Sequence, residues 1–104
     1  MRVLRFIVKG QSLQKDPNCD FSGIVRGSKG YLIAEFIPDA SWRGCTIAAS
    51  FWHFDKEYAV LVRNGKCEIP PEALHGFSVG VSLVGIKTGY RICTNRAKFE
   101  QEAE

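Results

Sequence analysis

The sequence contains few of the residues on which enzyme and metal sites depend. It has two histidines among 104 residues, His53 and His75, and neither lies in a motif that pairs a nucleophile with a base. The four cysteines stand 22 to 26 residues apart, without a C-x-x-C pair or a histidine at metal-ligand spacing; they are Cys19, Cys45, Cys67 and Cys93. We therefore predict that the protein is not an enzyme and has no metal ion or cofactor.

Long uncharged segments are missing as well. Uncharged segments such as residues 44–54 are much too short to cross a bilayer as a helix. Arg2, Arg5 and Lys9 interrupt the apolar residues near the N-terminus, where a signal peptide would need a continuous apolar run. We therefore expect no membrane association, and we expect the cysteines to be reduced, mostly buried thiols.

A concentrated run of basic residues is also lacking. Fourteen Lys and Arg against eleven Asp and Glu give a net charge of +3, and the basic residues stand singly or in pairs, whereas a dedicated duplex-DNA binder concentrates them in a stripe. Single strands are bound differently, by stacking of bases on aromatics beside Lys and Arg. Because the chain has twelve aromatic residues and basic turns at 26–29, 63–66 and 87–91, a small β-barrel that binds single-stranded nucleic acid is the alternative function. Nucleic acid is nevertheless the less favoured partner, since most of the aromatics alternate with polar neighbours as core residues do.

What the sequence does contain is a series of short strand-like segments. Leu, Ile, Val and Phe number 29 of 104 residues, which is enough for one small folded domain. Apolar and polar residues alternate with the period of two that marks half-buried strands, and turn residues separate the segments. The expected strands are 4–9, 31–37, 45–54, 58–62, 66–69, 77–84 and 90–94. The pattern predicts an all-β fold, a single antiparallel β-sandwich of six to eight strands.

Two local signals refine this pattern. Asn64-Gly65 predicts a type I′ hairpin that joins the strands on either side, since both residues tolerate positive φ. Pro70 limits extension of the preceding strand, and residues 70–74 predict one short helical turn.

Side chains at corners and strand ends have expected structural roles. Trp42 and Gly44 fall at a corner after Pro38, where the indole can cap one open end of the core. Polar residues close to strand ends are expected to satisfy backbone groups there; they are Gln11, Thr94 and Asn95.

The clearest strand, 77–84, has one nearly bare face. Its apolar face is formed by Phe77, Val79, Val81 and Leu83, and its bare face by Ser78, Gly80 and Ser82. A face with such small side chains is either one over which another element or a partner lies close, or a plain outer face. With Trp52 and Tyr58 as aromatic anchors, this bare face is the predicted protein interface, since interfaces favour exposed aromatics.

Six segments, in order, resemble motifs of a small β module of virion proteins from tailed phages and prophages of low-GC Gram-positive bacteria. The segments are 10–13 (G-Q-S-L), 31–36 (Y-L-I-A-E-F), 42–44 (W-R-G), 64–74 (N-G-K-C-E-I-P-P-E-A-L), 77–85 (F-S-V-G-V-S-L-V-G) and 91–95 (R-I-C-T-N). The resemblance extends over residues 3 to about 96. It implies an immunoglobulin-like β-sandwich that serves as a building block of baseplate, fibre or head-decoration proteins, and it implies no catalytic residues.

By this resemblance we expect a structural protein of the virion, made and folded in the cytoplasm of the bacterial host. Its partners would be other virion proteins of the capsid or of the tail and baseplate, and copies of the chain could associate as a homo-oligomer. Residues 1–98 are expected to form the sandwich module, and 99–104 an acidic C-terminal tail. Such modules are commonly fused to longer chains, so this length favours an accessory such as a capsid decoration or cement protein.

Overall fold

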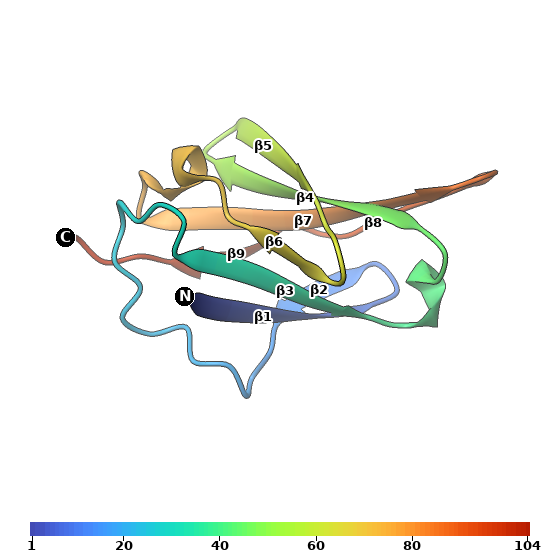
Figure 1. Cartoon of the computed structure of the whole chain (residues 1–104), viewed down its shortest axis with the longest axis horizontal. Helices are drawn as coiled ribbons and strands as arrows, with labels where there is room; N and C mark the ends of the chain where they lie inside the picture. The colour runs from blue at the N-terminus through green and yellow to red at the C-terminus, as the bar shows by residue number, and fades with distance from the viewer.

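Two sheets pack face to face in the computed structural model, which describes residues 1–104 (Figure 1). The strands are β1 (Arg2–Lys9), β2 (Ser12–Lys15), β3 (Leu32–Pro38), β4 (Thr46–His53), β5 (Lys56–Leu61), β6 (Lys66–Glu68), β7 (Ser78–Lys87), β8 (Tyr90–Cys93) and β9 (Ala97–Glu100). Two short 3-10 helices are η1 (Ala40–Trp42) and η2 (Pro71–Leu74). The all-β prediction is confirmed. There are nine strands rather than six to eight, because β2 and β9 have four residues each, too few to show an alternating pattern.

The four-stranded sheet has the order β2-β1-β3-β6 and contains one parallel pair. β1 is antiparallel to β2 but parallel to β3, with Arg5 opposite Glu35. The prediction of a wholly antiparallel sandwich is therefore wrong at this pair. Residues 16–31 join β2 to β3 and return the chain to the end where β1 begins, so β3 runs in the direction of β1. Alternation of apolar and polar residues occurs in half-buried strands of parallel and of antiparallel pairs, so the sequence pattern does not distinguish the two.

The second sheet has five strands and is built around β7. Its order is β5-β4-β7-β8, and β9 pairs with β7 as well. β8 pairs with residues 84–87 of β7, whereas β9 pairs with residues 78–81. β7 and β8 form an antiparallel hairpin, and its tip projects at one end of the molecule (Figure 1).

Alternate residues of both sheets meet in one core. The four-stranded sheet contributes Leu4, Phe6, Val8, Leu32, Ala34 and Phe36, and the five-stranded sheet contributes Ala49, Phe51, Val79, Val81, Leu83 and Phe99, all 3% exposed or less. The apolar face predicted for residues 77–84 is thus buried, with one exception. Phe77 precedes β7 and is 52% exposed, and the guanidinium of Arg26 lies 4.4 Å from the centroid of its ring.

The turn predicted at Asn64-Gly65 is present, but its flanking strands separate. The two residues have φ values of 54° and 77°, as a type I′ turn requires. Arg63 and Lys66 exchange both backbone hydrogen bonds across it, at 2.9 and 3.0 Å. The predicted hairpin is wrong beyond this point, because β5 belongs to the five-stranded sheet and β6 pairs with β3. A two-residue turn fixes only its immediate neighbours, so the chain crosses here from one sheet to the other.

Polar side chains connect the two sheets at the end of β2. Asn95 accepts a hydrogen bond from the Leu13 backbone N–H at 2.7 Å and donates to the Leu13 carbonyl at 3.1 Å. Gln11 donates to the Cys93 carbonyl at 3.1 Å, and the Thr94 hydroxyl accepts from the Leu83 N–H at 2.9 Å. The roles predicted for Gln11, Thr94 and Asn95 are confirmed.

The structure confirms the predicted helical turn and differs from the prediction at the cysteines. η2 confirms the helical turn expected at 70–74, and Pro70 is its N-cap. All four cysteines are free, but only Cys67 is buried, so the expectation of mostly buried thiols is wrong. Burial raises the pKa of the Cys67 thiol to about 12. None of the helices has the length and apolar character needed to cross a bilayer.

The C-terminal residues belong to the sandwich beyond the predicted boundary at residue 98. Phe99 is fully buried, and Gln101, 5% exposed, donates to the carbonyls of Leu74 and Gly76 at 3.2 and 2.7 Å. Glu102 forms a bridge to Val25. An acidic tail was expected from residue 99 onward, because a single buried Phe among acidic residues does not produce a periodic signal.

Candidate functional site

The predicted interface lies on the outer face of the five-stranded sheet. Ser78, Gly80 and Ser82 alternate along β7 with residues that are buried in the core. Trp52 of β4 is opposite Gly80 in the register, so it shares this outer face. Tyr58 does not, because it is paired with a core residue of β4 and packs against the core. The structure therefore brings together four of the five predicted residues and places Tyr58 on the inner face.

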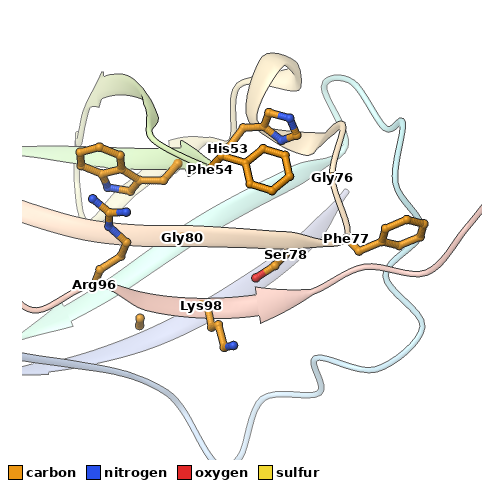
Figure 2. Close-up of a pocket in the computed structure, with 10 residues that line it drawn as sticks. His53, Phe54, Gly76, Phe77, Ser78, Gly80, Arg96 and Lys98 are labelled. Carbon is orange, nitrogen blue, oxygen red and sulfur yellow. The ribbon is translucent and has the colours of Figure 1, made fainter.

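The bare strand is covered by a side chain of the same chain. A β carbon built on Gly80 would lie 2.9 Å from Cδ of Arg96 and 3.0 Å from Cβ of Trp52, closer than real side chains approach. Arg96 comes from the segment between β8 and β9, and Figure 2 shows it extending across β7 beside Gly80. Gly80 therefore leaves the space that lets Arg96 cross the strand.

Arg96 and Trp52 form a stacked pair. The centre of the guanidinium lies 3.6 Å from the centroid of the indole ring. The indole Nε1–H of Trp52 donates to the Ser82 hydroxyl at 3.1 Å, which fixes the orientation of the ring. The arrangement is a cation–π contact held in place by a hydrogen bond from the neighbouring strand.

Beside this pair the surface is hollowed into a groove with a volume of about 440 Å³. We call it the aromatic groove; its lining is Trp52, His53, Phe54, Gly76, Phe77, Ser78, Gly80, Arg96, Ala97 and Lys98. Phe54 is 81% exposed. Figure 2 shows Phe54 next to His53 on one side of the groove, whereas Phe77 stands at the far end and points outward. Large aromatic surface is therefore open to solvent along this groove.

The backbone of the β4–β5 turn holds Phe54 out of the core. Phe54 has a φ of 56°, a left-handed conformation that is unusual for an aromatic residue. Its ring meets the His53 ring edge-on, with centroids 4.7 Å apart. Strained backbone of this kind often marks a functional position, because nothing in the fold itself rewards an exposed Phe there.

The charged groups of this face differ in whether they have partners. Lys98 lies 3.8 Å from the carboxylate of Glu100, and the Glu57 carboxylate accepts a hydrogen bond from Ser50. The guanidinium of Arg96 contacts the Trp52 ring but makes no hydrogen bond or ion pair within the chain. The groove therefore presents a fixed cation whose donors are free.

Other titratable groups near the groove are dispersed. No three His, Cys, Asp or Glu side chains lie close enough together to hold a metal ion. The Nδ1 atom of His53 is buried without a hydrogen-bond partner, against Gly76, where a β carbon would lie 2.9 Å from it. What the groove offers to a ligand is aromatic surface for stacking and one guanidinium for an anion.

Several groove residues were missed from the sequence. Phe77 was assigned to the core, and Phe54 was placed in a strand that actually ends at His53. Arg96 and Lys98 stand alone in the sequence, without a run or motif around them. The signal that could have found Arg96 was the bare face itself, which predicts a close neighbour without identifying it.

The remaining predicted residues lie away from the groove, at positions that shape the fold. Trp42 is 2% exposed, and its Nε1–H donates to the Gly10 carbonyl at 2.8 Å. Gly44 follows it with a φ of 81°, in the left-handed region that favours glycine. The turn at Asn64-Gly65 and the N-cap at Pro70 are described above.

Comparisons with known proteins do not assign the chain to a family. No protein-family model matches it, and no curated protein matches it. The function is therefore inferred from the side chains of the groove and from the motifs in the sequence.

Proposed function

We propose that the protein is a non-enzymatic structural component of a phage particle, which binds another virion protein through the aromatic groove. The motifs that resemble virion β modules support a role in the phage particle. The exposed aromatics of the groove support this groove as the binding surface. On the same resemblance, the sandwich is of the immunoglobulin-like type. A capsid decoration or cement protein, or a baseplate or tail accessory, is the role that follows, and association of several copies belongs to it.

The observation that carries this proposal is the exposure of aromatic side chains beside a bare strand. Phe54 and Phe77 are 81% and 52% exposed, and both border the same hollow. Aromatic anchors in a pocket contribute most of the binding energy in typical protein interfaces. Exposed aromatic side chains that border one hollow are unfavourable in water and mark an interaction site. We therefore expect a protein surface to cover them.

One experiment tests the proposal directly. Particles of the phage or prophage that encodes the chain are purified and analysed by mass spectrometry, with copy number from band intensity. We expect the protein in the particles, in hundreds of copies for a decoration protein or tens for a baseplate protein. Its absence from purified particles would contradict the proposal.

Variants supplied in trans show whether the groove makes the contact. Phe54→Ser is expected to reduce incorporation into particles, because it removes the most exposed ring of the groove. Tyr31→Ser is the matched control, since Tyr31 is 49% exposed and lies outside the groove. Equal incorporation of both variants would mean that another surface binds the particle.

A second candidate function is the binding of single-stranded nucleic acid. The observation that favours it is the position of Arg96 and Lys98 beside exposed rings, the combination on which bases stack. This candidate predicts tight retention on single-stranded DNA at low salt and a steep loss as salt rises. Weak retention with little salt dependence would support the structural role instead.

A further inference from the structure

The guanidinium of Arg96 is arranged as an anion-binding group. It lies flat enough on the Trp52 ring to bring the two centres within 3.6 Å, and no oxygen of the chain accepts a hydrogen bond from it. Stacking restricts the side chain, so less conformational freedom is lost when an anion binds. The planar fork of donors matches the two oxygens of a carboxylate.

The surface next to this cation is apolar and open. Arg96 itself covers Gly80, and beyond it Ser78 provides a floor with a small side chain, which Phe54 borders. A ligand that reaches Arg96 must therefore also lie against aromatic surface. An extended chain with a carboxylate and a neighbouring large apolar side chain meets both requirements.

The charges around the groove favour a single carboxylate over a chain of phosphates. Glu57 and Glu100 lie on the same outer face, paired in register with Trp52 and Ser78, and Lys98 is already within 3.8 Å of Glu100. A nucleic acid gains affinity from several neutralised phosphates. Arg26, a second guanidinium at this groove, lies 4.4 Å from the Phe77 ring and donates to the His75 carbonyl at 3.3 Å, which leaves Arg96 as the guanidinium without a hydrogen-bond partner. One such guanidinium between two carboxylates suits one acidic side chain better than a chain of phosphates.

We propose that the aromatic groove binds an extended protein segment in which an acidic side chain stands close to an aromatic or large aliphatic one. The carboxylate pairs with Arg96, and the apolar side chain packs against Phe54 over Ser78. This inference rests on the proposed function, and it specifies the chemistry of the protein segment that the groove binds.

The test uses blocked peptides in a Gly-Ser background, with one Glu and one Phe placed one to three residues apart. Binding to the ¹⁵N-labelled full chain is followed by NMR, through the indole N–H signal of Trp52 and the backbone N–H signal of Gly80. We expect the best Glu peptide to shift both signals, and its Glu→Gln form to bind roughly tenfold more weakly, since charge-assisted hydrogen bonds are lost. Replacement of the peptide's Phe by Ala should weaken binding by a similar factor.

Variants of the protein assign the effect to Arg96. Arg96→Gln should bind the Glu peptide roughly tenfold more weakly and bind the Gln peptide as the wild type does. Arg43→Gln is the control, because Arg43 is exposed and lies outside the groove. Unchanged NMR spectra outside the groove will show that each variant is folded.

Three results would overturn the inference: equal binding of Glu and Gln peptides, no binding of any peptide, or tighter binding of an oligothymidylate with steep salt dependence. These are separable from a failure of the proposed function. If particles contain the protein but Arg96→Gln is incorporated normally, the proposed chemistry is wrong and the structural role stands. If particles lack the protein while the Glu peptide binds, the proposed role is wrong and the chemistry of the groove stands.

Discussion

Two tryptophans each lie against a glycine of β7, one inside the sandwich and the other on its outer surface. Trp42 lies against Gly85, where a β carbon would be 2.7 Å from Cε3 of the indole, and Trp52 lies beside Gly80 at 3.0 Å. The glycines are five residues apart on β7, so they face opposite sides of the sheet. The first pair is inside the sandwich, and the second is on its outer surface.

The difference between the pairs is in what covers the indole. At the Trp42 corner, Tyr90 of the β7–β8 hairpin donates to the Ser41 carbonyl at 2.6 Å, and Lys87 donates to the Arg43 carbonyl at 2.8 Å, which closes the corner. Trp52 is covered by the side chain of Arg96 and by no further element of the fold. The Trp42–Gly85 contact is therefore structural, because other elements of the fold cover it. The Trp52–Gly80 contact is available for binding, because the side chain of Arg96 is its only cover.

The largest expected effect comes from removing each indole. Trp42→Ala should lower the free energy of unfolding by about 3–5 kcal/mol, because it leaves a cavity in the core and removes the hydrogen bond to Gly10. Trp52→Ala should cost about 1 kcal/mol, a typical value for a single substitution. Urea unfolding measures both. Equal losses would mean that the outer pair also supports the fold, and the comparison would fail.

Adding one methyl group to each glycine tests the same contrast with a smaller change. Gly85→Ala should cost roughly 1–3 kcal/mol, because the buried indole has no room to move. Gly80→Ala should change stability by no more than roughly 1 kcal/mol, because Arg96 can move aside and the Cβ of Trp52, 3.0 Å away, has to give by only a few tenths of an ångström. In NMR spectra, Gly80→Ala should shift the indole signal of Trp52 and leave that of Trp42 in place. A loss for Gly80→Ala as large as for Gly85→Ala would contradict this.

Much of the fold follows from the sequence because alternation reports burial. Alternation predicts the inward side chains of Val79, Val81 and Leu83, and the residue types at Asn64-Gly65 predict the turn there. Alternation does not report which strand lies next to which. The parallel pairing of β1 with β3 and the separation of β5 from β6 depend on the path of residues 16–31 and on long-range packing.

The sequence predicts the part of the candidate site that lies on β4 and β7, but not the residues that reach it from elsewhere in the chain. The bare face of β7 was visible as Ser78, Gly80 and Ser82, and Trp52 was placed on it correctly. Arg96 reaches Gly80 from a different part of the chain, and a contact between isolated residues has no sequence pattern. The exposure of Phe54 depends on a left-handed backbone that ordinary propensities do not assign to Phe.

A smaller effect is expected from removing the cation that covers Trp52. Arg96→Gln should lower the free energy of unfolding by about 0.5–1 kcal/mol, the contribution of an exposed cation–π contact. No ion pair is lost with it, so the change should be nearly the same at low and high salt. Thermal or urea unfolding of Arg96→Gln and of the control Arg43→Gln measures this. A loss above about 2 kcal/mol would show that Arg96 has a structural role in place of a binding one.

The smallest expected effect is a local response of the Trp42 corner to acid. Asp39 accepts hydrogen bonds from the backbone N–H groups of Gly10 and Ser41, at 2.8 and 3.0 Å, and these bonds lower the pKa of its carboxyl below its ordinary value. A depressed pKa contributes stability that is present above the unfolded value of about 3.9 and is lost as the pH falls through the folded pKa. Below about pH 4 the indole signal of Trp42 should therefore begin to shift in NMR spectra, while that of Trp52 stays in place. Asp39→Asn removes the titrating group and should abolish the shift; the same shift in Asp39→Asn would assign it to another carboxyl.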